Sequence, residues 1–263
     1  MTHLNLTRRA GLAAALALVF TPALASAAEV RVMISGAFRP AFAKISSEWA
    51  QKTGNTVVTL AGPSFGATPE AVPNRLKRGE PGDLIIVARE SLDQMVKDGY
   101  LVKGTETDLI LSLIAMGVKT GNPIPDIKTL DGLKKTLLDA KSIAYSDSAS
   151  GIYIETEMYK KLGIPQVAAK SKMIPATPVG EILVAGQADI GFQQVSELMA
   201  VPGVTIVGTL PEGAQKPTLF SAAIASKAKE AAAARSLLAE LVSPANYAAI
   251  RASGVEPAAT AKR

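Results

Sequence analysis

The residues best suited to bind a ligand lie in four short segments rich in small and hydroxyl-bearing residues. These segments are residues 35–40 (SGAFRP), 62–68 (GPSFGAT), 146–151 (SDSASG) and 176–180 (ATPVG). Each follows a predicted strand and begins a predicted helix, so its backbone N–H groups are free and the helix dipole favours an anion. Serine, threonine and glycine also cap helices that bind nothing, and capping is the simpler explanation for any one segment. Four in succession indicate an anion-binding site, in which Ser35, Gly36 and Gly151 let hydroxyl and backbone groups approach the ligand.

Two arginines and two glutamines add groups that suit a carboxylate. Arg39 closes the first segment and Arg89 follows the predicted strand 84–88. A guanidinium grips a carboxylate with two parallel hydrogen bonds, and the amides of Gln193 and Gln194 can bind further oxygens. The alternative is that Arg39 is a solvated arginine at a helix start and Arg89 an exposed loop charge. The rings expected to bound a carbon skeleton are those of Phe38, Phe65 and Tyr153.

Missing residue types exclude several kinds of chemistry. The only histidine, His3, lies in the N-terminal segment that we expect to be cleaved, and there is no cysteine. Imidazole- or thiol-based nucleophilic catalysis, Cys/His zinc sites and disulfides are therefore excluded, although a carboxylate pair or a Ser-Lys dyad stays open. Aromatic residues make up only 5%, and a net charge of +5 without a basic stripe is not typical of a nucleic-acid-binding protein. We expect no cofactor, no metal and no enzymatic activity.

The N-terminus has the pattern of a cleaved export signal. Arg8 and Arg9 precede the apolar run 10–20, and Ala25-Ser26-Ala27 offers a signal-peptidase site. The run is shorter than the roughly 20 residues that span a bilayer, and no cysteine is available for lipid attachment. We predict a signal peptide of residues 1–27, exported by the Sec or the twin-arginine route, and a monomer free in the periplasm without a membrane anchor.

From residue 30 onwards, short β-rich runs alternate with helical stretches, which predicts an α/β fold with mostly parallel sheets. An apolar run over 109–118 is long enough to start in one lobe and end in another. The clearest helices are 40–52, 133–139 and 228–242. The predicted strands are 30–34, 57–60, 84–88, 109–118, 142–145, 173–175, 190–192, 204–207 and 219–225.

The order of several motifs resembles one known family over nearly the whole chain after residue 27. The family is that of the molybdate-binding proteins of ABC importers, within the type II periplasmic binding proteins. The motifs are Val32-Met33-Ile34-Ser35-Gly36-Ala37-Phe38, Gly79-Glu80-Pro81-Gly82-Asp83-Leu84, Ser150-Gly151-Ile152-Tyr153, Lys161-Leu162-Gly163, Gly186-Gln187-Ala188-Asp189-Ile190-Gly191, Ser243-Pro244 and Ser253-Gly254-Val255.

This resemblance implies a two-lobed architecture and a transport role. Residues 28–110 and 208–263 would form the first lobe and 111–207 the second, joined by two hinge crossings, with a small anion held in the cleft. Such a protein delivers its ligand to an ABC permease in the inner membrane.

The resemblance also implies particular ligand contacts. The family's first-loop serine falls on Ala37, its second on Ser64, its backbone donors on Ser150 and Val179, and its tyrosine on Gln194. Two of these five positions have lost a hydroxyl, which favours an organic carboxylate over an oxyanion. Two alternatives remain open: a receptor for molybdate, tungstate or another oxyanion, and a sensor or enzyme on the same fold.

Overall fold

The computed structural model describes residues 27–261. The predicted signal peptide therefore lies, except for Ala27, outside the described residues, and its cleavage stays a prediction. Among the described residues, no helix is both long and apolar enough to cross a membrane.

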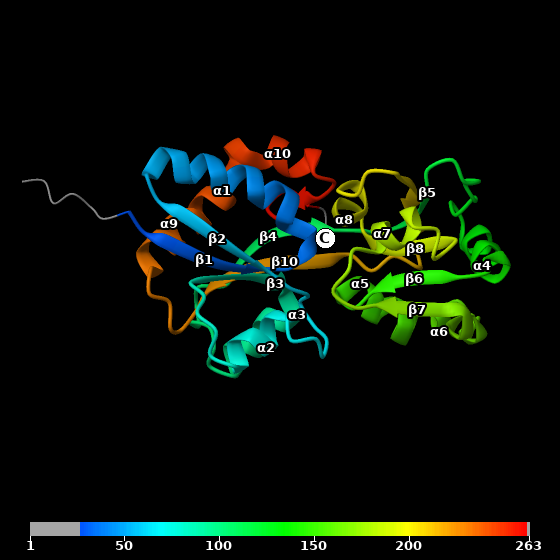
Figure 1. Ribbon diagram of the computed structural model, residues 1–263, viewed down its shortest axis with the longest axis horizontal. Helices are drawn as coiled ribbons and strands as arrows, with labels where there is room; N and C mark the ends of the chain where they lie inside the picture. The colour runs from blue at the N-terminus through cyan, green and yellow to red at the C-terminus, as the bar shows by residue number, and fades with distance from the viewer. Residues whose placement is uncertain (1–26, 262–263) are drawn as a thin grey trace, which may run out of the picture.

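The chain forms two sheets side by side, each flanked by helices (Figure 1). The first has six strands in the order β11-β4-β10-β3-β1-β2, and the second has five in the order β7-β6-β8-β5-β9. The predicted two-lobed α/β fold is confirmed. The strands are β1 Glu29–Ile34, β2 Thr56–Ala61, β3 Leu84–Ala88, β4 Thr107–Ser112, β5 Ile114–Lys119, β6 Ile143–Ser146, β7 Ser171–Ile174, β8 Ile190–Gln194, β9 Val204–Thr209, β10 Thr218–Ile224 and β11 Glu256–Pro257.

Helices cover both faces of the first sheet. Its central strand β3 is buried along its whole length, so it needs an apolar layer on each side. On one face, Phe42, Ile45 and Trp49 of α1 follow helical spacing and pack with α9 and α10. On the other face lie α2 and α3. The helices of this lobe are η1 Gly36–Phe38, α1 Arg39–Thr53, α2 Val72–Lys77, α3 Arg89–Lys97, α9 Ala231–Leu241, η4 Pro244–Asn246 and α10 Tyr247–Ala252.

The second sheet is covered in the same way. One face packs against α4, α5 and the π-helical turn that follows α5, and the other packs against α7 and α8. Thr129 caps α4 by accepting a hydrogen bond from the backbone N–H of Gly132. The helices here are α4 Leu130–Asp139, α5 Ala149–Tyr153, the π-helical turn η2 Ile154–Met158, α6 Tyr159–Lys161, η3 Pro165–Lys170, α7 Val179–Val184 and α8 Val195–Met199.

Both sheets are mixed rather than mostly parallel. β1 pairs parallel with β2 and β3, but β10 is antiparallel to β3 and β4. In the second sheet β6 pairs parallel with β7 and β8, whereas β5 is antiparallel to β8 and β9. The antiparallel pairs follow from the crossings: β4 leads directly into β5, and β9 returns to β10.

The crossings lie slightly beyond the predicted boundaries. The run 109–118 is two strands, because β4 ends at Ser112 in the first sheet and β5 begins at Ile114 in the second. β9 stays in the second sheet to Thr209 and β10 begins in the first at Thr218. The predicted lobe boundaries after residues 110 and 207 are therefore each too early, and we propose changeovers at Leu113 and between Thr209 and Thr218.

Candidate functional site in the cleft between the lobes

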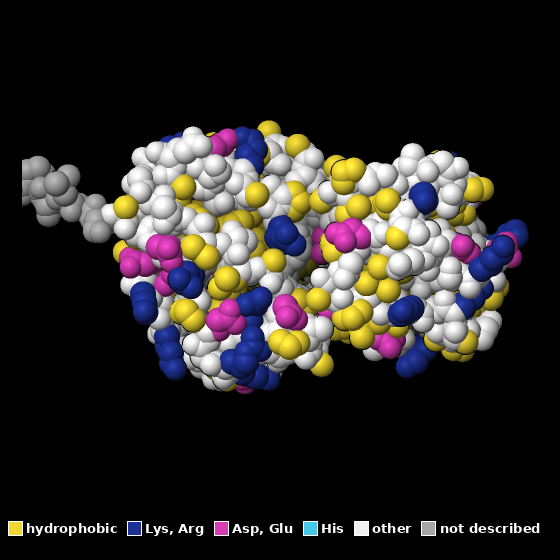
Figure 2. All heavy atoms as spheres, in the orientation of Figure 1, with side chains coloured by type: hydrophobic (Ala, Val, Ile, Leu, Met, Phe, Trp, Pro, Cys, Tyr) yellow, Lys and Arg dark blue, Asp and Glu magenta, His cyan; other side chains and the backbone are white. Residues whose placement is uncertain are grey.

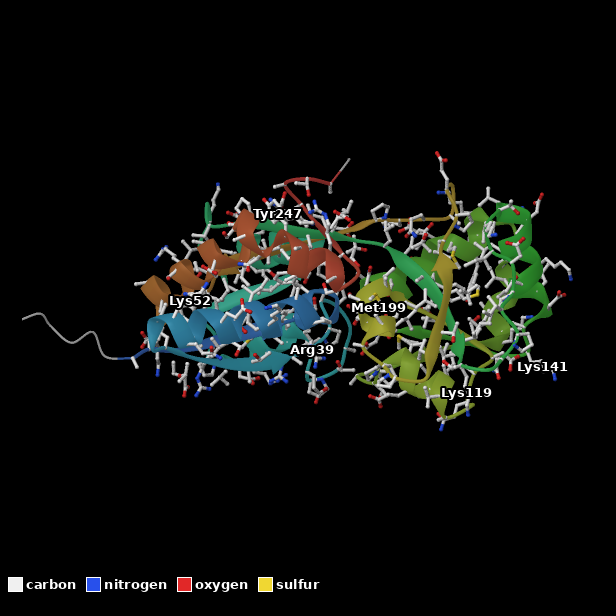
Figure 3. The ribbon with its side chains drawn as sticks, turned by 90° about the horizontal axis from the view of Figure 1, so that it is seen from above. Arg39, Lys52, Lys119, Lys141, Met199 and Tyr247 are labelled. Carbon is white, nitrogen blue, oxygen red and sulfur yellow. The ribbon has the colours of Figure 1, made fainter. Side chains whose placement is uncertain are left out.

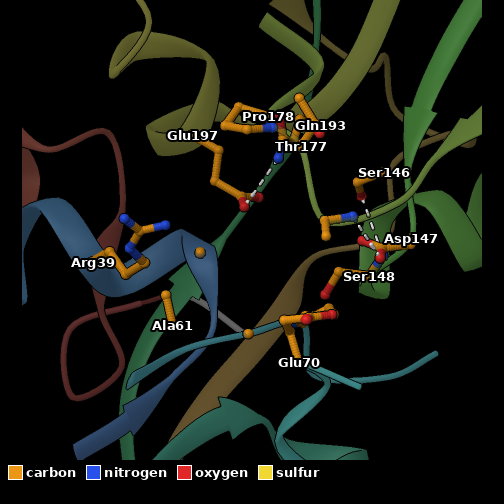
Figure 4. A pocket seen from close by; sticks show the side chains of 14 residues that line it. Arg39, Ala61, Glu70, Ser146, Asp147, Ser148, Thr177, Pro178, Gln193 and Glu197 are labelled. Carbon is orange, nitrogen blue, oxygen red and sulfur yellow. Dashed lines mark hydrogen bonds between the residues drawn. The ribbon is translucent and has the colours of Figure 1, made fainter. Parts of the chain in front are cut away.

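Residues from all four predicted segments meet in a cavity between the lobes (Figure 4). Its volume of about 140 Å³ is roughly that of five water molecules in the liquid. A wider cavity of about 520 Å³ adjoins it and shares Gly36, Arg39, Pro178, Gln193 and Glu197 with it. The residues that line the smaller cavity are Gly36, Arg39, Ala61, Gly62, Pro63, Glu70, Ser146, Asp147, Ser148, Ala176, Thr177, Pro178, Gln193 and Glu197.

The predicted serines of the first lobe are buried and bonded to each other. Ser64 Oγ donates to Ser35 Oγ at 2.9 Å and accepts from the backbone N–H of Ala88 at 2.9 Å. Both serines are at most 1% exposed. Neither lines the cavity, so these hydroxyls hold the first two segments together.

The third and fourth segments show the same internal bonding. Ser150 Oγ lies 3.0 Å from Ser146 Oγ, and Gly151 packs so closely that a Cβ there would lie 1.6 Å from the Ser146 carbonyl oxygen. Asp147 Oδ2 accepts the backbone N–H of Ala176 at 3.0 Å, which joins the two segments. Gly151 and Ser150 therefore shape the turn, while Asp147 lines the cavity.

Glu197 is the main residue of the cavity that the sequence patterns do not indicate. It lies on α8, a helix of five residues directly after β8. Its Oε1 occupies the space that a side chain on Gly36 would fill, since a Cβ there would lie 1.7 Å away. A glycine at position 36 thus lets a second-lobe carboxyl rest directly against the first lobe.

The carboxyl of Glu197 has a raised pKa. Burial raises its pKa from 4.5 to about 7. The backbone N–H of Gln194, the side-chain amide of Gln193 and the positive charge of Arg39 lower this pKa, whereas the negative charge of Asp147 raises it. A carboxyl with a pKa near 7 can accept and release a proton at neutral pH, as acid–base catalysis requires.

Arg39 lines both cavities. It begins α1 at the end of that helix nearest the second lobe, with Met199 of α8 across from it (Figure 3). Its side chain is exposed, and no hydrogen bond or ion pair of the guanidinium is found among residues 27–261. The guanidinium is therefore available to an anionic ligand.

Three predicted residues lie elsewhere. Phe65, Arg89 and Tyr153 line a separate cavity of about 310 Å³. Arg89 is bonded to Asp93 at 2.7 Å and Asp108 at 2.8 Å, and Tyr153 donates its hydroxyl to the Ala214 carbonyl at 2.8 Å. Residues of both lobes line this second cavity, but Phe65, Arg89 and Tyr153 do not reach the cavities that Arg39 and Glu197 line. The expectation that these three side chains share one site with Arg39 is therefore wrong.

The other predicted contacts are structural. Ala37 is buried, and its carbonyl accepts the hydroxyl of Ser196 at 2.7 Å. The Val179 N–H donates to Gln193 Oε1 at 2.9 Å, and Gln194 Nε2 donates to Thr218 Oγ1 at 3.2 Å. Phe38 is buried in the core of the first lobe. Of the thirteen predicted ligand contacts, those lining the cavity are Gly36, Arg39 and Gln193.

No cluster of three or more potential metal ligands occurs among the described residues.

In the space-filling view the molecule narrows where the two lobes meet (Figure 2).

The two lobes and the cavity between them agree with the proteins to which the chain is similar. Residues 30–256 match the model of the bacterial extracellular solute-binding proteins. The chain belongs to this family. The molybdate-binding protein of Azotobacter vinelandii is 27% identical over 241 residues, covering 88% of this chain and 90% of that protein. The solved structure of the periplasmic molybdate-binding protein of A. vinelandii superposes with a TM-score of 0.69 at 21% identity, covering 86% of this chain and 98% of that one.

A third similarity corrects one expectation. This solute-binding protein is 43% identical over 246 residues to an aconitate isomerase from a Pseudomonas species, covering 92% of this chain and 94% of that protein. The expectation that the chain is not an enzyme is therefore wrong. The missing imidazole and thiol exclude histidine and cysteine chemistry only, and the Glu197 carboxyl is a different acid–base group.

Proposed function

We propose that this protein binds a small unsaturated polycarboxylate between its lobes and isomerises it, with aconitate as the favoured substrate. The observation that carries the proposal is the Glu197 carboxyl, whose pKa of about 7 is matched to proton transfer at neutral pH. The 43% identity to an aconitate isomerase supports the substrate class.

The reaction needs a group that takes up a proton and returns it. Aconitate is a propene tricarboxylate, and its CH₂ group lies next to both a carboxylate and the double bond. Ionised Glu197 removes a proton from this carbon, and the electron pair is delocalised over the allylic system and its carboxylates. Return of the proton to the other end of that system moves the double bond and restores Glu197. Atoms and electrons balance without an oxidant or a cofactor.

Arg39 supplies the charge that holds the substrate. Its unpaired guanidinium can grip one carboxylate with two parallel hydrogen bonds, and it lines both cavities together with Glu197. The hydroxyl of Ser64, which matches an oxyanion ligand of the molybdate-binding proteins, is bonded to the hydroxyl of Ser35. This arrangement favours a carboxylate over a tetrahedral oxyanion.

The experiment is proton NMR of aconitate isomers incubated with the protein in D₂O. Isomerisation with deuterium entering the carbon skeleton is expected, because Glu197 exchanges its proton with solvent. Glu197→Gln should lower kcat by roughly 10²–10⁴-fold, the usual contribution of a general acid–base group. Glu48→Gln, on α1 and outside both cavities, is the control and should retain activity. Absence of turnover in the native protein would refute the proposed reaction.

A second candidate is capture of the ligand for an ABC importer, which the family match over residues 30–256 favours. In this case the protein lies in the periplasm after removal of residues 1–27 and hands its ligand to a permease. Calorimetric titration with aconitate, molybdate and tungstate distinguishes a carboxylate receptor from an oxyanion receptor. Binding of aconitate without turnover would favour capture over catalysis.

A further inference from the structure

Both ends of the Gln193 side-chain amide are engaged. Oε1 accepts the backbone N–H of Val179 at 2.9 Å, and Nε2 donates to Glu197 Oε1 at 3.1 Å. The side chain is only 5% exposed. Because the Val179 N–H can only donate, the amide oxygen must face Val179 and the NH₂ group must face Glu197. The orientation of the amide is thus determined by the backbone of α7.

The oxygen that Gln193 contacts is also the one that lies against Gly36. A Cβ at position 36 would lie 1.7 Å from Glu197 Oε1, so this oxygen is held between the amide and the first-lobe backbone. In a protonated carboxyl the carbonyl oxygen is the better hydrogen-bond acceptor, so an N–H that faces Oε1 favours the proton on Oε2.

We propose that Gln193 is a positioning residue that keeps Glu197 Oε1 as an acceptor and so assigns the transferable proton to Oε2. The inference rests on the proposed function, because this proton is the one that the isomerisation moves. Substrate protons would then enter and leave through a single oxygen of defined position.

Other charges also face Glu197. The backbone N–H of Gln194 also bonds to this carboxyl, and Arg39 of α1 and Asp147 of the segment between β6 and α5 act on it electrostatically. Glu70 lines the smaller cavity and Glu181 the wider one. The substitution at position 193 changes none of these residues. A shift in the titration of Glu197 therefore reports on the amide.

The test compares Gln193→Met and Gln193→Glu with the native protein. Gln193→Met removes the N–H group that donates to Glu197, and Gln193→Glu removes it and adds a second negative charge beside Glu197. Both substitutions should raise the pKa of Glu197, and Gln193→Glu should raise it more. The pH at which kcat/KM for aconitate is half-maximal should move up by about one unit or more. Carbon-13 NMR of protein labelled at its glutamate carboxyl carbons follows the same titration directly. The Glu197 signal is identified as the one missing from Glu197→Gln, and its pKa should rise in both Gln193 variants.

Gln187→Glu is the matched control, because Gln187 is exposed and the variant has the same change in charge. It should leave both titrations unchanged. Gln193→Glu retains an acceptor for Val179, so it decides the matter if Gln193→Met does not fold. A folded Gln193 variant whose Glu197 signal titrates as in the native protein would overturn the inference, whatever its activity. A shifted signal in a protein that never isomerises aconitate would uphold the role of Gln193 and refute the proposed reaction.

Discussion

Arg39 faces an unusual balance of charge in the cavity. Three carboxyl groups, those of Glu70, Asp147 and Glu197, line the same walls, while Arg39 supplies the positive charge. Asp147 is bonded to the Ala176 N–H, and Glu197 holds its proton up to about pH 7. The negative charge in the cavity is therefore smaller than the three charges that three ionised carboxylates would give, and it repels an anionic ligand less.

Replacing Arg39 by alanine should weaken carboxylate binding. Charge-assisted hydrogen bonds contribute roughly 1.5–3 kcal/mol each, so the Kd for aconitate should rise about tenfold to a few hundredfold. Calorimetry on the native protein and Arg39→Ala measures this, with Arg31→Ala, far from the cavity, as the control. Tight molybdate binding that survives in Arg39→Ala would instead show an oxyanion site that does not depend on this arginine.

The turns between strands and helices decide where the cavity walls lie. In the turn from β6 into α5, the Ser146–Ser150 contact and the close packing of Gly151 bring Asp147 and Ser148 to the cavity. Ser150 and Gly151, which resemble part of a ligand-binding loop, are thus also needed for the close packing of this turn.

Gly151→Ala should destabilise the protein because its Cβ would lie 1.6 Å from a backbone oxygen that cannot rotate away. Overpacking of this kind costs about 1–3 kcal/mol, so Tm should fall by roughly 2–12 °C for a chain of this size. Gly82→Ala, whose Cβ would meet only side-chain atoms at 3.2 Å or more, is the control in the same calorimetric melts. Equal Tm values for the two variants would contradict this account.

At the scale of the whole molecule, polar and close-packed contacts join the two lobes. Ser196 donates to the Ala37 carbonyl at 2.7 Å, Ser64 N–H donates to Ser148 Oγ at 3.3 Å, and Glu197 lies against Gly36. These contacts describe a closed conformation, in which burial disfavours the charged form of the Glu197 carboxyl.

Closure should therefore depend on pH. The pKa of Glu197 is about 7 in the closed form and should be close to the ordinary 4.5 when the lobes separate. Between pH 4.5 and pH 7, Glu197 is protonated more fully in the closed form than in the open form. Its contribution to the stability of the closed form relative to the open form is therefore greatest below about pH 4.5 and is lost as the pH rises through 7. Small-angle scattering of the ligand-free protein should show a larger radius of gyration at pH 8 than at pH 5.5. The same expansion in Glu197→Gln would exclude Glu197 as the cause.

The sequence patterns alone determined the α/β class and the four segments that meet in the cleft, and the resemblance of the motif order to the molybdate-binding proteins implied the two lobes. Strand and helix periodicity, together with small residues at strand ends, are local properties that a chain carries without its partners. Arg39 was found in this way, since it lies in one of these segments.

Glu197 became a candidate only through the tertiary structure. Nothing in its five-residue helix distinguishes it from a surface glutamate. Its raised pKa arises from burial, and it lies against Gly36, 161 positions earlier, across the lobe boundary. Arg89 and Tyr153 do not line the cavity of Glu197, and partners outside their own elements, Asp108 and Ala214, engage their polar groups. Burial and pairing between distant segments set the chemistry of these side chains, and only the folded chain defines them.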